Sequence, residues 1–487
     1  MKKAILLLLI TVNLSYAQSD KDLANESVTQ SIIKSHIGFL ASDELKGRDT
    51  GSQGLKVAAK YIESRFVEYG VSMVTGMNSY FQSVPMKTTT PPSAGFITIK
   101  DDSYAFKDDF LLLDGTNTDI SGSVVFVEYG TEKDLKKGKI EGKIVFALCG
   151  DGESQNPQEW FAQASQKRKM VKQMGAAALI ELYSSPQLPW SVFVRFLGRD
   201  QTGLDDQEAT LMPHIWMNRT AEDMASLKSK KLSASILIEG ATIEKFNSKN
   251  IVGYVGGTDE NLKNEFVVYS AHYDHVGIGR ADDTGDDIYN GARDNSVGTV
   301  TVLSAAQNIA KNPTRRSALF VLFTAEEKGL LGSQYFVENS PIALNEMVYC
   351  FNSDNGGYND TSLATIIGLT RTSAEDMIVE ACLAFGLKAT EDPVEEQGLF
   401  DRSDNVRFAA KGIPAPTFGM GFTALDEEIT KYYHQPADEP ESLDYEYLEK
   451  FFKSYVYACR LIGNADEAPF WIEGDKYYQA GIELYKK

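Results

Sequence analysis

Apolar runs with the length of buried strands recur through the second half of the chain. They cover residues 250–257, 266–271, 317–323, 346–352 and 415–422. Apolar positions at 3.6-residue spacing predict helices over 295–311 and 443–463. Strands that alternate with helices indicate an α/β fold, so we predict a mixed β-sheet flanked by helices, with 250–257 as a returning edge strand.

The first half of the chain shows two other patterns. Residues 27–85 have helical periodicity, and one of these helices should end at Gly70 as a C-cap. From about Thr88, the sequence TTTPPSAG predicts a linker, and short alternating strands such as SVVFVEYG follow it. The predicted divisions of the chain are a leader at 1–17, a main domain at 18–89 and 249–487, and an inserted, mainly β domain at 90–248.

Acids and histidines follow the predicted strands. His272 comes after the second apolar run, and Asp354 comes after the fourth. Glu326 and Glu327 follow the third run, and Asp294 lies just before the predicted helix at 295–311. Taken singly, His272 could be a core histidine and Asp294 a helix N-cap. Because sites of α/β sheets collect at the carboxyl ends of strands, the repetition favours a functional site.

The residues at these strand ends have the chemistry of metal ligands. The candidate ligands are His272, Asp294, Glu327, Asp354 and His434. Two imidazoles and three carboxylates suit zinc and lack the thiolates of structural zinc sites. One zinc ion would not use five ligands, whereas two ions roughly 3.5–4 Å apart can share a bridging carboxylate. Asp294 is the natural bridge, since a short carboxylate at a helix start has little freedom.

These residues stand in motifs that resemble the co-catalytic di-zinc aminopeptidases, whose relatives include glutamate carboxypeptidases, glutaminyl cyclases and transferrin receptors. The motifs are His272-Tyr273-Asp274, Gly291-Ala292-Arg293-Asp294-Asn295, Glu326-Glu327, Asp354 in FNSDNGG and His434 in YHQPAD. The resemblance covers most of the chain after the leader and implies two zinc ions and peptide hydrolysis. One departure is Asn405 in Ser403-Asp404-Asn405, where many relatives have histidine, and it leaves the predicted ligands unchanged.

The resemblance also implies roles for the residues beside the ligands. Glu326 would be the general base and Glu327 a ligand. Asp274 would orient His272, and His275 matches a frequent histidine that is not a ligand.

Both the N-terminus and the C-terminus of the peptide are candidates for the end that is cleaved. The predicted specificity loop contains Glu395, Glu396, Arg402 and Arg407, which offer acids for a substrate ammonium and bases for a substrate carboxylate. We predict an aminopeptidase, with a dipeptidase or carboxypeptidase as the main alternative. A glutaminyl cyclase would use one zinc ion, and a receptor or scaffold would have lost ligands. Tyr433 could stabilise an oxyanion with its phenol or simply pack as an aromatic side chain.

Composition narrows the class of protein further. The chain has 487 residues, 43% of them hydrophobic, which suffices for a sizeable core and more than one domain. With 48 basic and 68 acidic residues, it has a net charge of −20 and no Lys/Arg-rich stripe. We therefore expect a peptide substrate as its partner and neither nucleic acid nor a membrane surface.

The cysteines show neither a metal-binding nor a disulfide-rich pattern. They are Cys149, Cys350, Cys382 and Cys459, and no two of them form a C-x-x-C pair. We expect them to be buried as small apolar side chains, with a single disulfide as the alternative.

Two segments bear on location and accessory function. Residues 1–17, MKKAILLLLITVNLSYA, have two lysines, an apolar core and a small-x-Ala end, which predicts a secretory signal. We expect a soluble protein in the periplasm or outside the cell, with an uncleaved anchor as the alternative. In the inserted domain, KIEGKIVFALCG and MPHIWMNRTAEDMASL resemble a protease-associated domain. His214 lies in the second of these segments and is expected to be structural.

Overall fold

The computed structural model describes residues 18–154, 157–185, 187–205, 212–228 and 231–486, so the predicted leader at 1–17 lies outside the described residues. The chain forms two compact units. Unit 1 comprises Met1–Val84 and Ser248–Lys487, and unit 2 comprises Pro85–Asn247. Within the described ranges, no helix has the length and apolar character needed to cross a membrane.

Unit 1 is built around a mixed β-sheet. In spatial order its strands are β18 (Lys388–Thr390), β17 (Leu363–Ile367), β19 (Thr417–Met420), β16 (Met347–Ser353), β12 (Phe266–His272), β15 (Ser317–Phe323), β11 (Thr242–Val255) and β1 (Phe81–Thr90). Strands β19, β16, β12 and β15 run parallel, whereas β17 and β11 pair antiparallel with β19 and β15. The four parallel strands therefore end at the same edge of the sheet.

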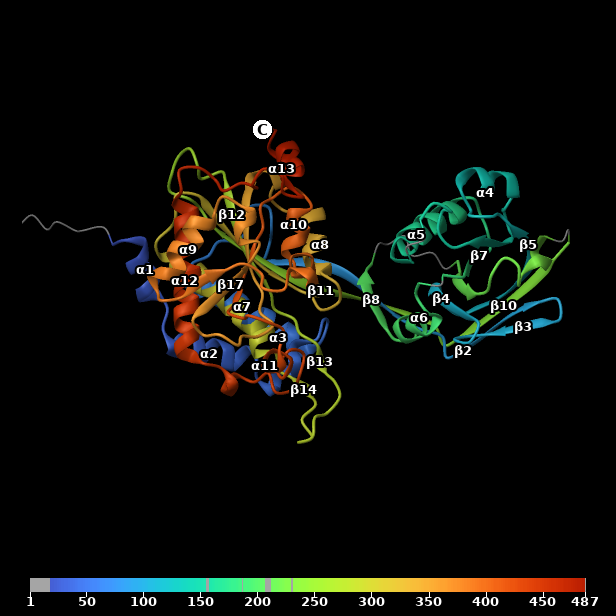
Figure 1. The fold of residues 1–487 in the computed structure, drawn as a ribbon, viewed down its shortest axis with the longest axis horizontal. Coiled ribbons are helices and arrows are strands. Elements are labelled where there is room, and N and C mark those ends of the chain that lie inside the picture. The colour runs from blue at the N-terminus through green and yellow to red at the C-terminus, as the bar shows by residue number, and fades with distance from the viewer. Residues whose placement is uncertain (1–17, 155–156, 186, 206–211, 229–230, 487) are drawn as a thin grey trace, which may run out of the picture. The chain divides into compact units, whose positions relative to one another are not determined.

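Helices cover both faces of this sheet (Figure 1). On one face lie α1 (Asp20–Ser27), α2 (Gln30–Leu40), α3 (Gln53–Tyr69), α7 (Gly298–Lys311), α9 (Glu375–Ala384) and α12 (Tyr445–Asn464), and on the other lie α8 (Leu331–Glu338), α10 (Asn405–Ala409) and α13 (Tyr478–Tyr485). Phe320 of β15 packs in the first core, and its neighbours Leu319 and Val321 pack in the second. Because successive side chains of a strand point to opposite faces, one apolar run supplies both cores. The predicted helix-flanked sheet is confirmed.

Two predicted helices form close to their predicted bounds. Helix α3 begins after Ser52, whose hydroxyl accepts a hydrogen bond from the Leu55 N–H, and it ends at Gly70 in the left-handed conformation, with φ of 80°. Helix α12 begins after Asp444, whose carboxylate accepts hydrogen bonds from the first turn. Polar caps and a C-terminal glycine thus fix these boundaries locally.

Three boundaries in unit 1 differ from the prediction. Strand β1 occupies residues that were predicted as helix up to 85 and as linker from Thr88. Strand β11 is not an edge strand, because β1 lies along its second side. Helix α7 begins at Gly298 rather than at Asn295, because residues 292–297 form a wider turn with non-helical backbone angles at two positions.

Unit 2 has its own sheet and cores. In spatial order its strands are β3 (Asp102–Ala105), β2 (Ala94–Ile99), β10 (Ser233–Glu239), β5 (Thr118–Phe126), β6 (Ile144–Leu148), β7 (Ala178–Tyr183), β9 (His214–Asn218) and β4 (Phe110–Asp114). Its helices are α4 (Glu132–Gly138), α5 (Pro157–Gln173) and α6 (Trp190–Leu197), and β8 (Gln201–Leu204) pairs with the last residues of β1. Phe146 and Val145, neighbours in β6, belong to two separate apolar clusters, so unit 2 is covered on both faces of its sheet.

A buried polar network in unit 2 centres on Glu181. His214 Nε2 lies 2.7 Å from Glu181 Oε2, and the Glu181 carboxylate also accepts hydrogen bonds from Lys167 and the Trp216 indole. His214 is therefore held in a structural network, as predicted. The four cysteines of the chain are buried and free, which confirms their predicted role as packing side chains.

Candidate metal centre

The parallel strands of unit 1 carry the predicted ligands to one edge of the sheet. His272 is the last residue of β12, and Asp354 directly follows β16. Glu327 lies in the turn after β15, and His434 lies between α11 (Glu427–Thr430) and α12. Residues that are up to 162 positions apart in the sequence, from His272 to His434, thus meet at one place.

Asp294 is positioned by the turn that precedes α7. Gly291, with φ of 59°, starts this turn, and the peptide bond after Asp294 is cis. The Asp438 carboxylate accepts hydrogen bonds from the backbone N–H groups of Arg293 and Asp294, and it also pairs with the Arg293 guanidinium at 3.0 Å. The loop that follows His434 therefore fixes the backbone of Asp294.

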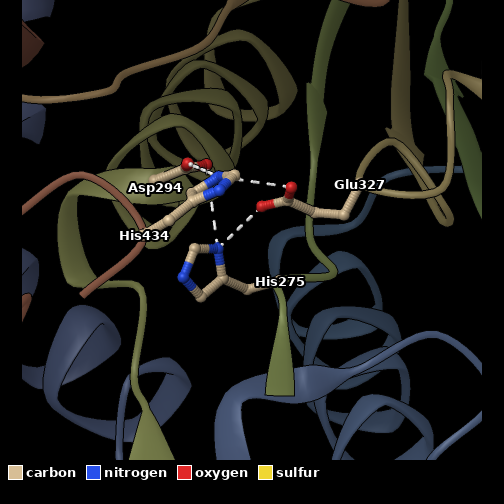
Figure 2. A group of neighbouring side chains, drawn as sticks. All are labelled: His275, Asp294, Glu327 and His434. Carbon is tan, nitrogen blue, oxygen red and sulfur yellow. Dashed lines mark hydrogen bonds and ion pairs between the residues drawn. The ribbon is translucent and has the colours of Figure 1, made fainter. Parts of the chain in front are cut away.

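The ligand atoms fall into two groups that share Asp294 (Figure 2 shows one of them). In the first group, His272 Nε2 lies 3.3 Å from Asp294 Oδ1 and 3.2 Å from Asp354 Oδ1. In the second group, His434 Nε2 lies 3.0 Å from Asp294 Oδ2 and 3.3 Å from Glu327 Oε2. Each oxygen of Asp294 therefore faces a different group.

These separations fit zinc. Two ligand atoms bound at about 2.0–2.1 Å to one tetrahedral ion lie about 3.3 Å apart, which matches the distances within each group. The donors are imidazole nitrogens and carboxylate oxygens, which zinc accepts readily. The arrangement thus fits two zinc ions: His272 and Asp354 would hold one, Glu327 and His434 would hold the other, and Asp294 would be shared.

Mutual contacts set the charge of the ligands. Burial acts to raise the pKa of Asp294, but its contacts with His272 and His434 hold this pKa below its usual range. Burial and the charge of Asp294 likewise oppose ionisation of Glu327, yet its contacts with His275 and His434 lower its pKa to about 2. Asp294 and Glu327 are therefore ionised, the form in which a carboxylate binds a cation.

Glu326 differs from the adjacent Glu327. Burial holds the pKa of Glu326 well above its usual value, against the opposing effect of His272 and together with the charges of nearby acids. Its side chain lines the same cavity as the ligands, and its backbone N–H donates to Asp274 Oδ1 at 3.1 Å. A carboxylate with a raised proton affinity, close to the ligands but outside both ligand groups, suits a general base.

Asp274 contacts His272 mainly through its backbone. His272 Nδ1 lies 3.1 Å from the Asp274 carbonyl oxygen and 3.8 Å from the Asp274 carboxylate. That carboxylate accepts hydrogen bonds from the Thr50 hydroxyl and the Glu326 N–H, and burial raises its pKa to about 6. Asp274 thus contacts the His272 ring through its carbonyl oxygen and the Glu326 backbone through its carboxylate.

Two residues near the centre were not singled out by the sequence. Arg48 is buried and donates hydrogen bonds to the carbonyl oxygens of Leu40, Tyr273, Asn290 and Gly291. It therefore joins the segment after β12 to the turn that holds Asp294. Its only sequence signal is its place in the glycine-rich segment LKGRDTGSQG.

The second such residue is Asp404 in the SDN segment. Asp404 is fully buried, and neither of its carboxylate oxygens has a hydrogen-bond partner among the described residues. Burial raises its pKa to about 7. A carboxyl group that holds a proton near neutrality can remain buried without a cationic partner. Its chemical type alone would not have distinguished Asp404 from the other 67 acids of the chain.

A cavity of about 210 Å³ opens onto the ligands. Its apolar lining is Ile367, Leu399, Met420, Phe422, Leu425 and Ile429. Tyr433 and Arg402 also line it, and the Tyr433 ring stacks on His434 with centroids 4.2 Å apart. The cavity thus offers an apolar side chain a place next to the candidate ligands.

The fold and this site are those expected of a metal-dependent hydrolase of the α/β class. Residues 250–458, which contain all five predicted ligands, match the model of peptidase family M28. The predicted family is confirmed.

Individual relatives agree with this assignment. Aminopeptidase YwaD of Bacillus subtilis (strain 168) is 29% identical over 232 residues, which cover 47% of this chain and 47% of that protein. A probable leucine aminopeptidase of Trichophyton verrucosum (strain HKI 0517) is 26% identical over 237 residues, which cover 45% of this chain and 58% of that protein. The chain thus spans about half the length of the curated relatives it matches.

A solved structure supports the fold. The aminopeptidase from Aneurinibacillus sp. strain AM-1 superposes with a TM-score of 0.52 at 20% identity, over 92% of this chain and 97% of that one. At this identity the likeness establishes the shared architecture.

Proposed function

We propose that this protein is an exported two-zinc aminopeptidase that removes N-terminal residues from peptides. The proposal rests on one observation: the two carboxylate oxygens of Asp294 face two separate ligand groups. A bridging carboxylate of this kind is what a two-metal hydrolytic site requires. The names of the relatives favour aminopeptidase activity among the peptidases.

Glu326 has the central role in the proposed reaction. Bound zinc ions supply Lewis acidity, which activates water and polarises a carbonyl group. Glu326 takes a proton from the attacking water and passes it to the amine that leaves. The Asp274 carboxylate holds the Glu326 backbone, and the Asp274 carbonyl oxygen contacts the His272 ring. One residue therefore positions both the general base and a metal ligand.

Tyr433 is placed to stabilise the developing oxyanion. Its side chain lines the cavity beside the ligands and is 38% exposed. Burial, then the charges of Asp294 and Glu327, raises its pKa above its ordinary value, so the phenol keeps its proton and can donate a hydrogen bond.

One observation favours a second candidate function, a dipeptidase or carboxypeptidase. Arg402 is the only lysine or arginine among the described residues that line the cavity, and no hydrogen-bond or ion-pair partner occupies it within the described ranges. An unpaired guanidinium can bind the carboxylate of a short peptide. The paired ligand groups speak against a one-zinc cyclase.

Matched substrates test which function holds. Hydrolysis of Leu-Gly-Gly, leucinamide and an N-blocked peptide should be compared at saturating zinc, in the wild type and in Arg402→Gln. The proposed function predicts cleavage of the first two and none of the blocked peptide. Cleavage of the blocked peptide from its C-terminus, lost in Arg402→Gln, would favour the carboxypeptidase instead.

We also propose that residues 1–17 direct export and that residues 90–248 form a protease-associated-like domain. The basic start, apolar core and Ala17 support the first proposal. Amino-terminal sequencing of the exported protein should begin at Gln18. A protein that retains Met1 after export would contradict cleavage.

A further inference from the structure

His275 stands with Asp294, Glu327 and His434 in the second group of possible ligand atoms, although neither the motifs nor the mechanism gives it a function. Its side chain is fully buried, and its Nδ1 is 2.8 Å from Glu327 Oε1 (Figure 2). The other oxygen of the same carboxylate, Oε2, lies 3.3 Å from His434 Nε2, inside the ligand group. The two oxygens of Glu327 therefore face different partners.

The surroundings of the ring indicate that His275 is not itself a ligand. A metal-binding histidine almost always donates its second ring N–H to an acceptor. His272 follows this rule, since its Nδ1 contacts the Asp274 carbonyl while its Nε2 faces the ligand group. In contrast, His275 Nε2 is buried without a hydrogen-bond partner among the described residues. The tautomer that leaves this Nε2 without a proton puts the proton on Nδ1, which then donates to Glu327.

The backbone holds the His275 ring in this position. The His275 N–H donates to the Arg48 carbonyl at 3.2 Å, and a Cβ atom on Gly291 would come within 2.6 Å of the ring. Gly291 is tied in turn to Arg48 by a hydrogen bond to its carbonyl oxygen. The ring is thus packed against a fixed turn, and it can direct Glu327 rather than follow it.

We propose that His275 is a positioning residue that keeps Glu327 a one-oxygen ligand. With Oε1 held by the His275 Nδ1–H, only Oε2 remains for the ion. Asp294, Glu327 and His434 then give that ion three protein ligands, and a fourth tetrahedral position stays open for water or substrate, as catalytic zinc requires. Without His275, both oxygens of Glu327 could bind and fill that position. This inference rests on the proposed two-zinc function.

Two substitutions at one position separate positioning from ligation. His275→Leu removes the hydrogen bond, whereas His275→Asn places a side-chain N–H near the position of Nδ1 but is a poor zinc ligand. His36→Gln, at another buried histidine on α2, controls for the loss of any buried imidazole. Thermal unfolding of each apoprotein verifies that it folds.

The measurements are zinc affinity, by competition with a chromophoric chelator, and the visible spectrum of the cobalt-substituted protein. Cobalt absorbs less strongly as its coordination number rises, so it reports whether Glu327 binds through one oxygen or two. We expect His275→Leu to weaken the second ion by about 10- to 100-fold and to lower the cobalt absorption. We expect His275→Asn to restore most of both, and His36→Gln to match the wild type.

Two results would overturn the inference. One is a His275→Leu protein with wild-type zinc affinity and an unchanged cobalt spectrum. The other is a His275→Asn protein as impaired as His275→Leu, which would mean that the imidazole itself binds the ion. If the wild-type protein binds fewer than two zinc ions, the proposed two-zinc function itself is wrong. This result is distinct from the two results above.

Discussion

Two adjacent glutamates show how much the position of one residue decides in this protein. Glu327 belongs to a ligand group, and its contacts lower its pKa to about 2. Glu326 lies outside both groups, and burial, with nearby acids, raises its pKa. The two residues are consecutive in the chain. The difference between their pKa values therefore comes from the groups that surround each side chain.

Replacement of Glu326 should separate catalysis from metal binding. Glu326→Gln keeps the size and polarity of the side chain but cannot accept the water's proton, so we expect kcat to fall by about 10²–10⁴-fold with both ions still bound. Glu327→Gln should instead weaken one ion and recover part of its activity at high zinc. Glu338→Gln, on the exposed side of α8, is the matched control. Zinc titration and turnover of each variant check this, and near-normal turnover in Glu326→Gln would contradict the assignment.

At the scale of elements, the site depends on segments that approach one another from distant parts of the sequence. The segment before α3 supplies Arg48, which bridges the carbonyl groups around Tyr273 and Asn290. The segment before α12 supplies Asp438, which fixes the Asp294 backbone. The strand ends alone therefore do not complete the site.

Loss of Arg48 should destabilise both the segment after β12 and the turn that holds Asp294. Arg48→Met keeps much of the apolar stem but leaves four buried carbonyl oxygens without this donor. Because each bond to a charged group contributes about 1.5–3 kcal/mol, we expect a loss of at least about 3 kcal/mol in the free energy of unfolding. Arg65→Met, on the surface of α3, is the control. Urea denaturation of the metal-free proteins measures the loss, and equal stability of the two variants would contradict this role.

The packing of α2 against α3 should respond to pH through His36. Burial, followed by the charge of Arg65, lowers the pKa of His36 to about 4. The unfolded chain binds a proton near pH 6.5 and the folded chain only near pH 4, so the stabilisation is complete above pH 6.5 and is lost as the pH falls toward 4. Relative to His36→Leu, the wild type should lose up to about 3 kcal/mol over this window. Urea denaturation at pH 7 and pH 4.5 tests this, and parallel losses in both proteins would contradict it.

The sequence predicted the elements that carry the ligands better than those that support them. Strand β15 has the predicted bounds, because an apolar run buried on both faces has a clear start and end. Strand β1 was mistaken for helix and linker, because it is only partly buried and ends in threonines. Arg48 and Asp404 escaped detection because their partners, or the lack of them, depend on tertiary contacts that spacing does not encode.

At the scale of the whole molecule, two units with separate cores imply two separable parts. Residues Val84 and Ser248 lie in strands that are neighbours in the sheet order of unit 1. Replacement of residues 85–247 by a short glycine-serine linker should therefore leave a folded core that binds zinc, and the excised unit should fold alone. Circular dichroism and zinc titration check both parts. Aggregation of both would contradict the division.

The central claim is that Asp294 bridges two zinc ions, and anomalous diffraction at the zinc edge tests it most directly. We predict two peaks roughly 3.5–4 Å apart, one beside His272 and Asp354 and the other beside Glu327 and His434, with one Asp294 oxygen on each. A single peak at zinc saturation, or two peaks that do not share Asp294, would contradict the account.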